Sequence, residues 1–221
     1  MDKKQISQAI ETALEEKGKR KFTQTVEAVF NFKGLDVSKP ENRINMDIIL
    51  PKGRGKDVPI IAFAEQQAAM DAQKAGAVKV LGKADIEKLK VNKKELKKMA
   101  SESEFVATPQ LMIEVGKNLG QVLGGRGKLP RPVAGSMDAA IKQAKARVRL
   151  QTRGKYLPTI QCAIGTEAMS VSDLVENFDV VYEKIREKVG ESAMGALYVK
   201  LTMGKAIRMG QKQAEETAAK V

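Results

Sequence analysis

The sequence predicts a protein of mixed class, α+β and α/β, in which a discontinuous antiparallel domain is interrupted by an inserted parallel domain. Near both ends of the chain, apolar and polar residues alternate over long segments, which is typical of antiparallel strands with one buried face. Between these segments, short apolar runs are each followed by helix-like sequence, which indicates a parallel sheet of doubly wound type. We expect residues 1–56 and 157–221 to form the discontinuous domain and residues 57–156 the inserted domain.

The amino-terminal segment predicts one helix, two strands and a linker. Residues 2–17 repeat an apolar residue every four positions, as one face of a helix does. Residues 22–32 and 43–50 alternate between apolar and polar side chains, so each predicts a half-buried strand. The segment PKGRGKDVP at 51–59 contains two prolines and two glycines, which break regular structure and predict a linker.

The middle of the chain predicts strands that alternate with helices. Its apolar runs are 59–65, 77–82 and 104–108. Thr108 and Pro109 suit the N-cap and first turn of a helix, because threonine accepts a bond from a free N–H and proline lacks one. Residues 84–99 are rich in lysine and predict helical turns with a solvated face.

The carboxy-terminal segment returns to the antiparallel pattern, with strands expected at 156–165 and 196–204 and a long amphipathic helix at 170–190. Two helices can cover only one face of a four-stranded sheet. The expected open face carries Thr23, Thr25, Arg43, Asn45, Thr159, Gln161, Tyr198, Lys200 and Thr202. Such groups suit hydrogen bonds to sugars and phosphates, but antiparallel sheets also commonly leave a polar face to water, and the pattern leaves both readings open.

The charge balance indicates a polyanionic partner. The chain has 39 Lys and Arg against 27 Asp and Glu, a net charge of +12, and a pI near 9.7. Residues 126–155 hold nine cations and one acid, or +8 of that total, without the interleaving of opposite charges that a solvated face usually shows. We therefore expect contact between this region and a nucleic-acid backbone.

Composition excludes several classes of site. The chain has no histidine, so histidine catalysis is excluded, and its single cysteine excludes an internal disulfide and a zinc finger. We expect no metal, no cofactor and a reducing, cytoplasmic environment. No apolar run approaches the roughly 18 residues of a membrane-spanning helix, and the start MDKKQISQAI is too polar for a signal peptide, so no membrane partner is expected.

The segment GGRGKLPRP at 124–132 matches neither nucleotide-binding template. A P-loop ending at Gly127-Lys128 would need glycine at 122 and a hydroxyl at 129, where Val122 and Leu129 stand. A dinucleotide fingerprint fails as well, because Pro130 occupies the place of its third glycine. Two readings remain: a loop that contacts phosphate with its cations, or a crossover that needs glycine for tight turns.

The residues from 115 to 132, VGKNLGQVLGGRGKLPRP, resemble the signature of the ribosomal protein L-one family in its archaeal form. KFTQTVEAVFNF (21–32) resembles the family's first strand and YVKLTMGKAIRM (198–209) its last, in the same order. The resemblance implies a discontinuous antiparallel α+β sandwich domain that binds RNA, with an inserted Rossmann-like domain.

The resemblance also implies which residues bind RNA. The family's principal contacts map onto Phe22, Thr23, Thr25, Glu27, Thr202, Met203 and Gly204, and Lys200 extends outward beside them. Secondary basic contacts are expected from Arg126, Lys128, Arg131, Arg153 and Lys155. A glycine at 204 would let backbone approach the RNA closely and turn sharply.

The implied partners are large-subunit ribosomal RNA at the mobile stalk near the tRNA exit site, deacylated tRNA on the ribosome, and the protein's own mRNA, whose translation it would repress. The free protein is expected to be a monomer in the cytoplasm. The alternative function is a nucleotide- or phosphate-using enzyme of Rossmann type, against which stand the missing glycine fingerprint and the absence of histidine.

Overall fold

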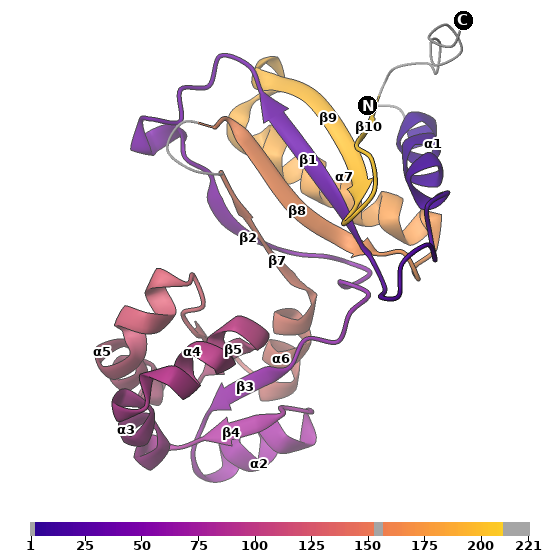
Figure 1. Cartoon of the computed structure of the whole chain (residues 1–221). Coiled ribbons are helices and arrows are strands. Elements are labelled where there is room, and N and C mark those ends of the chain that lie inside the picture. Colours follow the sequence, from indigo (N-terminus) through magenta and orange to yellow (C-terminus); the bar gives the residue numbers. More distant parts are fainter. Residues whose placement is uncertain (1–2, 153–156, 210–221) are drawn as a thin grey trace, which may run out of the picture. The chain divides into compact units, whose positions relative to one another are not determined.

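The protein consists of two units, which Figure 1 shows in a computed structural model that describes residues 3–152 and 157–209. The terminal unit comprises Met1–Lys56 and Arg147–Val221, and the inserted unit comprises Asp57–Ala146. The chain returns to the terminal unit at residue 147, whereas the sequence placed that crossing at residue 157. The difference arises because Arg147–Gln151 forms a strand that pairs within the terminal unit.

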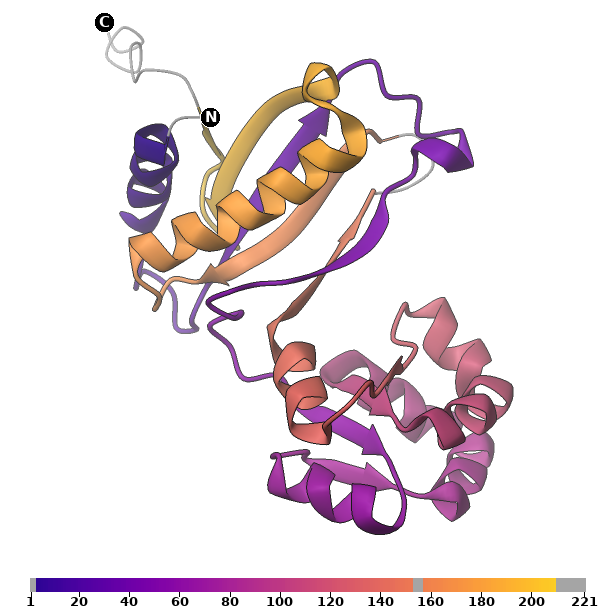
Figure 2. The ribbon, with the colours of Figure 1, turned by 180° about the vertical axis from the view of Figure 1, so that it is seen from behind.

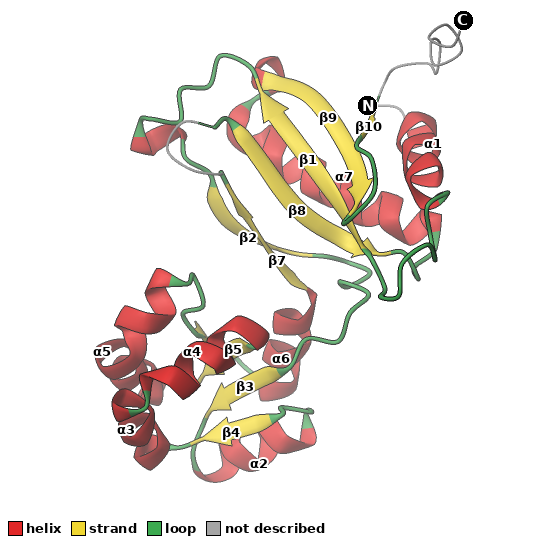
Figure 3. Cartoon of the chain, in the orientation of Figure 1, coloured by secondary structure: helices red, strands yellow, loops and turns green. Residues whose placement is uncertain are grey.

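The terminal unit is a four-stranded antiparallel sheet in the order β10-β9-β1-β8, packed against two helices. Its strands are β1 (Thr25–Phe32), β8 (Thr159–Thr166), β9 (Met194–Leu201) and β10 (Ile207–Arg208); its helices are α1 (Lys3–Leu14) and α7 (Val171–Val189), with 3-10 turns at Pro40–Asn42 and Glu191–Ala193. Figure 2 shows α7 lying along one face of this sheet. Figure 3 shows the opposite face, over which no helix of the described residues of this unit lies.

Alternation along β1 decides which face is buried. Val26, Ala28 and Phe30 are fully buried, while the residues between them are half-buried. The ring of Phe30 stacks on Phe178 of α7, with 5.5 Å between ring centroids. Burial of each large apolar side chain contributes roughly 1.5–3 kcal/mol, so this face holds the helices to the sheet.

The strand expected at 43–50 does not join the four-stranded sheet. It forms β2 (Asn45–Ile49), which pairs antiparallel with β7 (Arg147–Gln151) in a separate two-stranded sheet. The fourth strand of the main sheet is the short β10. Arg43 and Asn45 are therefore not part of the open face to which the sequence assigned them.

The inserted unit is a parallel sheet in the order β4-β3-β5-β6 with helices on both faces, as the doubly wound pattern predicted. Its strands are β3 (Ile60–Phe63), β4 (Lys79–Leu81), β5 (Glu104–Ala107) and β6 (Arg131–Pro132); its helices are α2 (Gln66–Lys74), α3 (Lys83–Val91), α4 (Lys93–Glu102), α5 (Pro109–Gly125) and α6 (Met137–Ala146). Ile60 and Ala62 of β3 pack in one apolar cluster with α2 and α6, and Ile61 and Phe63 in another with α3, α4 and α5.

The segment 124–132 ends a helix and forms an edge strand. After α5, the N–H of Gly127 donates to the carbonyl of Gly124 (2.9 Å) and that of Lys128 to the carbonyl of Leu123 (2.9 Å), a Schellman ending. Gly127 has φ +66°, which glycine adopts without strain. β6 then pairs with β5. Gly127 thus makes the tight turn that the crossover reading requires.

Lys128 is committed to an ion pair inside the inserted unit. Its Nζ lies 2.5 Å from Oε1 of Glu104, whose side chain is 10 % exposed at the start of β5. A nearly buried carboxylate needs such a partner because its charge is poorly solvated. The expectation that Lys128 contacts phosphate is therefore not supported, because its ammonium group neutralises Glu104.

Replacing Lys128 with methionine should lower the free energy of unfolding by about 1–3 kcal/mol, since the nearly buried Glu104 carboxylate loses its ion pair with Lys128. Adding Glu104→Gln should recover most of this loss, which urea-induced unfolding would measure. The control is Lys142→Met, whose exposed ion pair with Asp138 (2.7 Å) should contribute less than about 0.5 kcal/mol. Equal losses for the two lysines would contradict the structural role of Lys128.

Burial raises the pKa of the Cys162 thiol from its ordinary 9.0 to about 12, and the Glu27 carboxylate adds to the shift. The folded protein therefore keeps this proton between pH 9 and 12, whereas the unfolded chain loses it. We expect a stabilising contribution that is complete below pH 9 and is lost progressively up to pH 12. Between pH 9 and 12, the free energy of unfolding should therefore decrease less steeply with pH for Cys162→Ala than for the unaltered protein. At pH 8, an aromatic disulfide reagent should leave the thiol of the folded protein unmodified.

Candidate RNA-binding site

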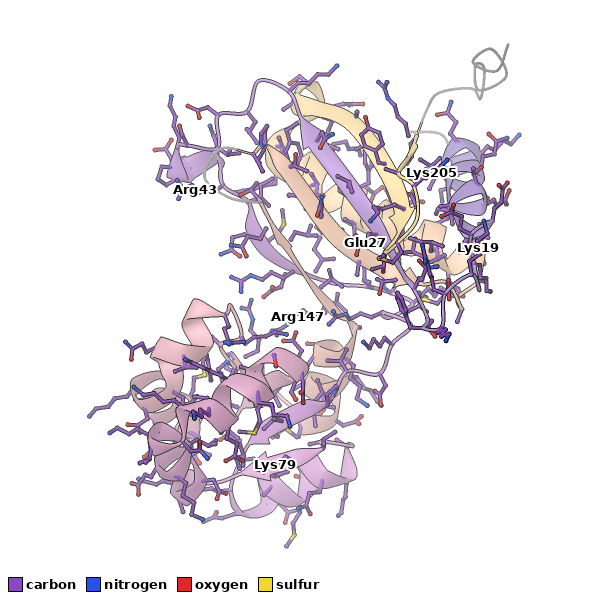
Figure 4. All side chains as sticks on the ribbon, viewed as in Figure 1. Lys19, Glu27, Arg43, Lys79, Arg147 and Lys205 are labelled. Atoms are coloured by element: carbon purple, nitrogen blue, oxygen red, sulfur yellow. The ribbon has the colours of Figure 1, made fainter. Side chains whose placement is uncertain are left out.

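The candidate site lies where the start of β1 meets the end of β9. Antiparallel pairing sets Glu27 directly opposite Lys200. The pairing brings residues 22–27 beside residues 200–204, so the two groups predicted to bind RNA meet despite their separation in the chain. Figure 4 shows the side chains of this region, with Glu27 labelled.

Thr202 uses its hydroxyl within the protein. Oγ1 accepts a hydrogen bond from the Thr25 N–H (3.1 Å) and donates one to the Thr25 carbonyl (3.3 Å), which also accepts from the Thr202 N–H (3.0 Å). The hydroxyl proton is thus committed, and one acceptor lone pair remains. A ribose 2′-OH can donate to that lone pair but cannot receive a bond from this hydroxyl.

Lys200 connects the strand to the turn that follows it. Its Nζ donates to the carbonyl of Thr202 (2.9 Å) and lies 3.9 Å from Oε2 of Glu27. Both side chains are about three-quarters buried. A carboxylate in this position can accept hydrogen bonds and repels phosphate, so it would favour some placements of a bound RNA over others.

Two large apolar side chains extend outward at the site. Phe22 is 51 % exposed and Met203 is 58 % exposed, although the chain buries most of its other large apolar residues. Thr23 beside them is also exposed. An exposed ring and a polarisable thioether next to hydrogen-bonding groups suit contact with the faces of unstacked bases.

Gly204 is packed inside the protein more closely than the sequence indicated. A Cβ at this position would lie 2.9 Å from Oε2 of Glu16 and 3.1 Å from Cβ of Leu201. The Gly204 N–H closes the turn by donating to the Leu201 carbonyl (3.0 Å). A side chain at 204 would therefore crowd Leu201, independently of any approach of the backbone to RNA.

Gln24 and Glu167 belong to the site and were not found from the sequence. Gln24 is 1 % exposed; its Nε2 donates to Oε2 of Glu167 (3.3 Å) and its Oε1 accepts from the Met203 N–H (3.2 Å). Glu167 is 6 % exposed. Gln24 stands among exposed polar residues in the sequence, so no local pattern distinguishes it as buried.

A basic pocket adjoins the same turn. It has a volume of about 450 Å³ and is lined by Glu16, Lys19, Arg20, Gln24, Met203, Gly204 and Lys205. Within the described part of the chain, its three cations form no ion pair. The signal in the sequence is KGKRK at 17–21, directly before the first strand. It is shorter than the basic segment at 126–155, to which the sequence analysis assigned the phosphate contacts.

That larger segment is divided between the two units. Residues up to 146 belong to the inserted unit and those from 147 to the terminal unit. Lys142 is paired with Asp138, and Lys145 lies 3.2 Å from Asp57.

The secondary basic contacts have different environments. Arg126 and Arg131 are exposed in the inserted unit, whereas Lys128 is bound to Glu104. Arg153 and Lys155 lie outside the described residues.

Neither a metal site nor a membrane-spanning helix is found in residues 3–152 and 157–209. Across these ranges, no group of three or more Cys, Asp or Glu side chains is arranged to hold a metal ion. The helices of the same residues are too short or too polar to cross a bilayer.

Comparison with known proteins gives one consistent result. Residues 12–205 match the ribosomal protein L1p/L10e family. The large ribosomal subunit protein uL1 of Methanocella arvoryzae is 38 % identical over 212 residues, which cover 95 % of this chain and 100 % of the relative. The uL1 proteins of Methanothermobacter thermautotrophicus and Thermoplasma volcanium are each 39 % identical, covering 93 % and 95 % of this chain and 98 % of each relative.

The match spans both units and every described residue of the candidate site from Glu16 to Lys205. Because the matched family is one of ribosomal proteins, the alternative of a Rossmann-type enzyme is set aside. The relatives are archaeal, in agreement with the lysine-containing signature GGRGKLP. The chain belongs to the ribosomal protein L1p/L10e family, in its archaeal form.

Proposed function

We propose that the protein is a structural constituent of the large ribosomal subunit that binds large-subunit ribosomal RNA through its terminal unit, at the mobile stalk near the tRNA exit site. One observation carries the proposal: exposed Met203 stands on a turn whose backbone is fixed by internal hydrogen bonds, and the adjoining pocket holds cations that form no ion pair with any described residue. Exposed Phe22 lies in the segment that leads into β1. A fixed turn binds with little loss of conformational freedom, which favours a specific RNA shape.

The groups at the site divide into two kinds of contact. Lys19, Arg20 and Lys205 supply charge for phosphates, which raises affinity without reading sequence. Phe22 and Met203 supply surfaces for unstacked bases or sugars, which depend on the fold of the RNA. Arg126 and Arg131 of the inserted unit add secondary phosphate contacts.

The same site would bind the protein's own mRNA. A messenger that folds into a similar stem and loop would compete with ribosomal RNA for the terminal unit, so free protein would repress its own translation only when ribosomal RNA is occupied. On the ribosome, deacylated tRNA leaving the exit site would be a further partner. The protein would act as a monomer in the cytoplasm when it is not bound to the ribosome.

Replacing Phe22 or Met203 with alanine should weaken binding to a transcript of the stem-and-loop region of large-subunit ribosomal RNA by about 1–3 kcal/mol, because a stacking surface is removed. Filter binding would measure the affinity. The control is Ile113→Ala on α5, an apolar side chain that is 77 % exposed in the inserted unit. If Ile113→Ala weakens binding as much as the site variants do, the site is misplaced.

Removing charge from the pocket should reduce the dependence of RNA affinity on salt. The variants are Lys19→Gln, Arg20→Gln and Lys205→Gln. In each, the fall of log K with log salt concentration should become less steep, by about 0.7–0.9 for each phosphate that the protein no longer neutralises. Lys94→Gln and Lys97→Gln, at exposed cations on α4, serve as matched controls and should leave the slope unchanged. Equal reductions in both sets would indicate that binding follows net charge alone.

A further inference from the structure

We infer that Gln24 and Glu167 act as a positioning pair, which holds the turn at Met203 in the conformation that binds RNA. The inference rests on the proposed function of that turn, and it assigns a role to two residues that are almost fully buried. Gln24 is 1 % exposed and Glu167 is 6 % exposed, although Phe22 and Thr23 just before Gln24 in the chain are open to solvent.

The pair connects three separate segments of the terminal unit. The Gln24 carbonyl accepts from the Glu167 N–H (3.0 Å), which fixes the entry of β1 beside the exit of β8. The Gln24 side chain then spans from Oε2 of Glu167 (3.3 Å) to the backbone N–H of Met203 (3.2 Å), after the end of β9. Each polar group of this side chain is therefore used in fixing one segment against another.

The turn depends on this bond because its other backbone groups are already used. The Thr202 N–H donates to Thr25 and the Gly204 N–H to Leu201. The Met203 N–H lies between them and is bonded to the Gln24 amide oxygen alone among its described neighbours. Gln24 thus fixes the backbone of the residue whose side chain is offered to RNA.

Glu167 determines which way the Gln24 amide faces. A carboxylate only accepts hydrogen bonds, so it must face the NH₂ group of the amide. The amide oxygen is then directed at Met203, whose backbone N–H is the donor. With the amide reversed, oxygen would face the carboxylate and NH₂ would face an N–H, so both contacts would be repulsive. The charge of Glu167 therefore sets a single orientation.

The test first removes the side-chain amide of Gln24. It then exchanges the amide and the carboxylate between positions 24 and 167. Gln24→Met keeps the length of the side chain and removes both bonds; we expect RNA affinity to fall about tenfold and hydrogen exchange of the Met203 amide to speed up about tenfold, the equivalent of one hydrogen bond. Gln24→Glu should do at least as much, because two carboxylates then face each other. Adding Glu167→Gln to Gln24→Glu restores one donor and one acceptor, and should return both measurements to within about threefold of the unaltered protein.

The matched control is Asn177→Asp, the same change from amide to carboxylate at a fully buried position of α7 that bonds Lys52, Gly53 and Ile164. It should lower the melting temperature and leave the RNA affinity of the folded protein within about twofold. All measurements are made well below the melting temperature of each variant, with circular dichroism to verify folding.

The two readouts separate the inference from the function on which it rests. If the unaltered protein does not distinguish the ribosomal stem and loop from a scrambled one, the proposed function fails, and hydrogen exchange still decides whether Gln24 fixes the turn. The inference is overturned if Gln24→Met leaves the Met203 amide equally protected, or if the exchanged pair fails to recover. It is also overturned if Asn177→Asp weakens RNA binding as much as Gln24→Glu.

Discussion

Strand β1 is held by β8 on one edge and by β9 on the other, and the rest of the terminal unit depends on this double pairing. It places one row of β1 side chains against α1 and α7 and sets the entry of β1 beside the ends of both partners. Since β8 and β9 come after the inserted unit in the chain, the pairing also closes the long excursion through residues 57–146. The chain leaves the terminal unit after residue 56 and returns to it at residue 147. Strands β2 and β7, which pair Ile49 with Arg147, hold these two connections side by side.

Periodicity predicted the elements of this fold better than it predicted their partners. The helix expected at 170–190 is α7, because its apolar spacing and Ser170 cap are both local signals. The strand expected at 43–50 exists as β2, but alternation does not say which strand lies alongside, and the sequence assigned it to the wrong sheet. β10 has two residues, too few for any period to appear. The exit from the inserted unit was misplaced because β7 follows α6 without an intervening linker.

In the candidate site as well, the sequence indicated some residues, whereas others could be identified only from the fold. Phe22, Met203 and Gly204 are indicated by their resemblance to a family signature, and the structure adds why the turn is rigid. Gln24 was missed because its burial depends on a turn that arrives from the far end of the chain. Lys128 was assigned to phosphate because a cation in a basic segment cannot be distinguished by sequence from one that neutralises a buried acid.

The order of the strands has a consequence for synthesis. The inserted unit is complete once residue 146 has been translated, and its parallel sheet requires nothing from later in the chain. The turn at Met203, by contrast, follows β9 and is fixed by Gln24 only after residues 194–204 have emerged. A nascent chain can therefore carry a folded inserted unit for part of its time on the translating ribosome before the proposed RNA site exists. For a protein proposed to repress its own messenger, only finished molecules contribute to that feedback.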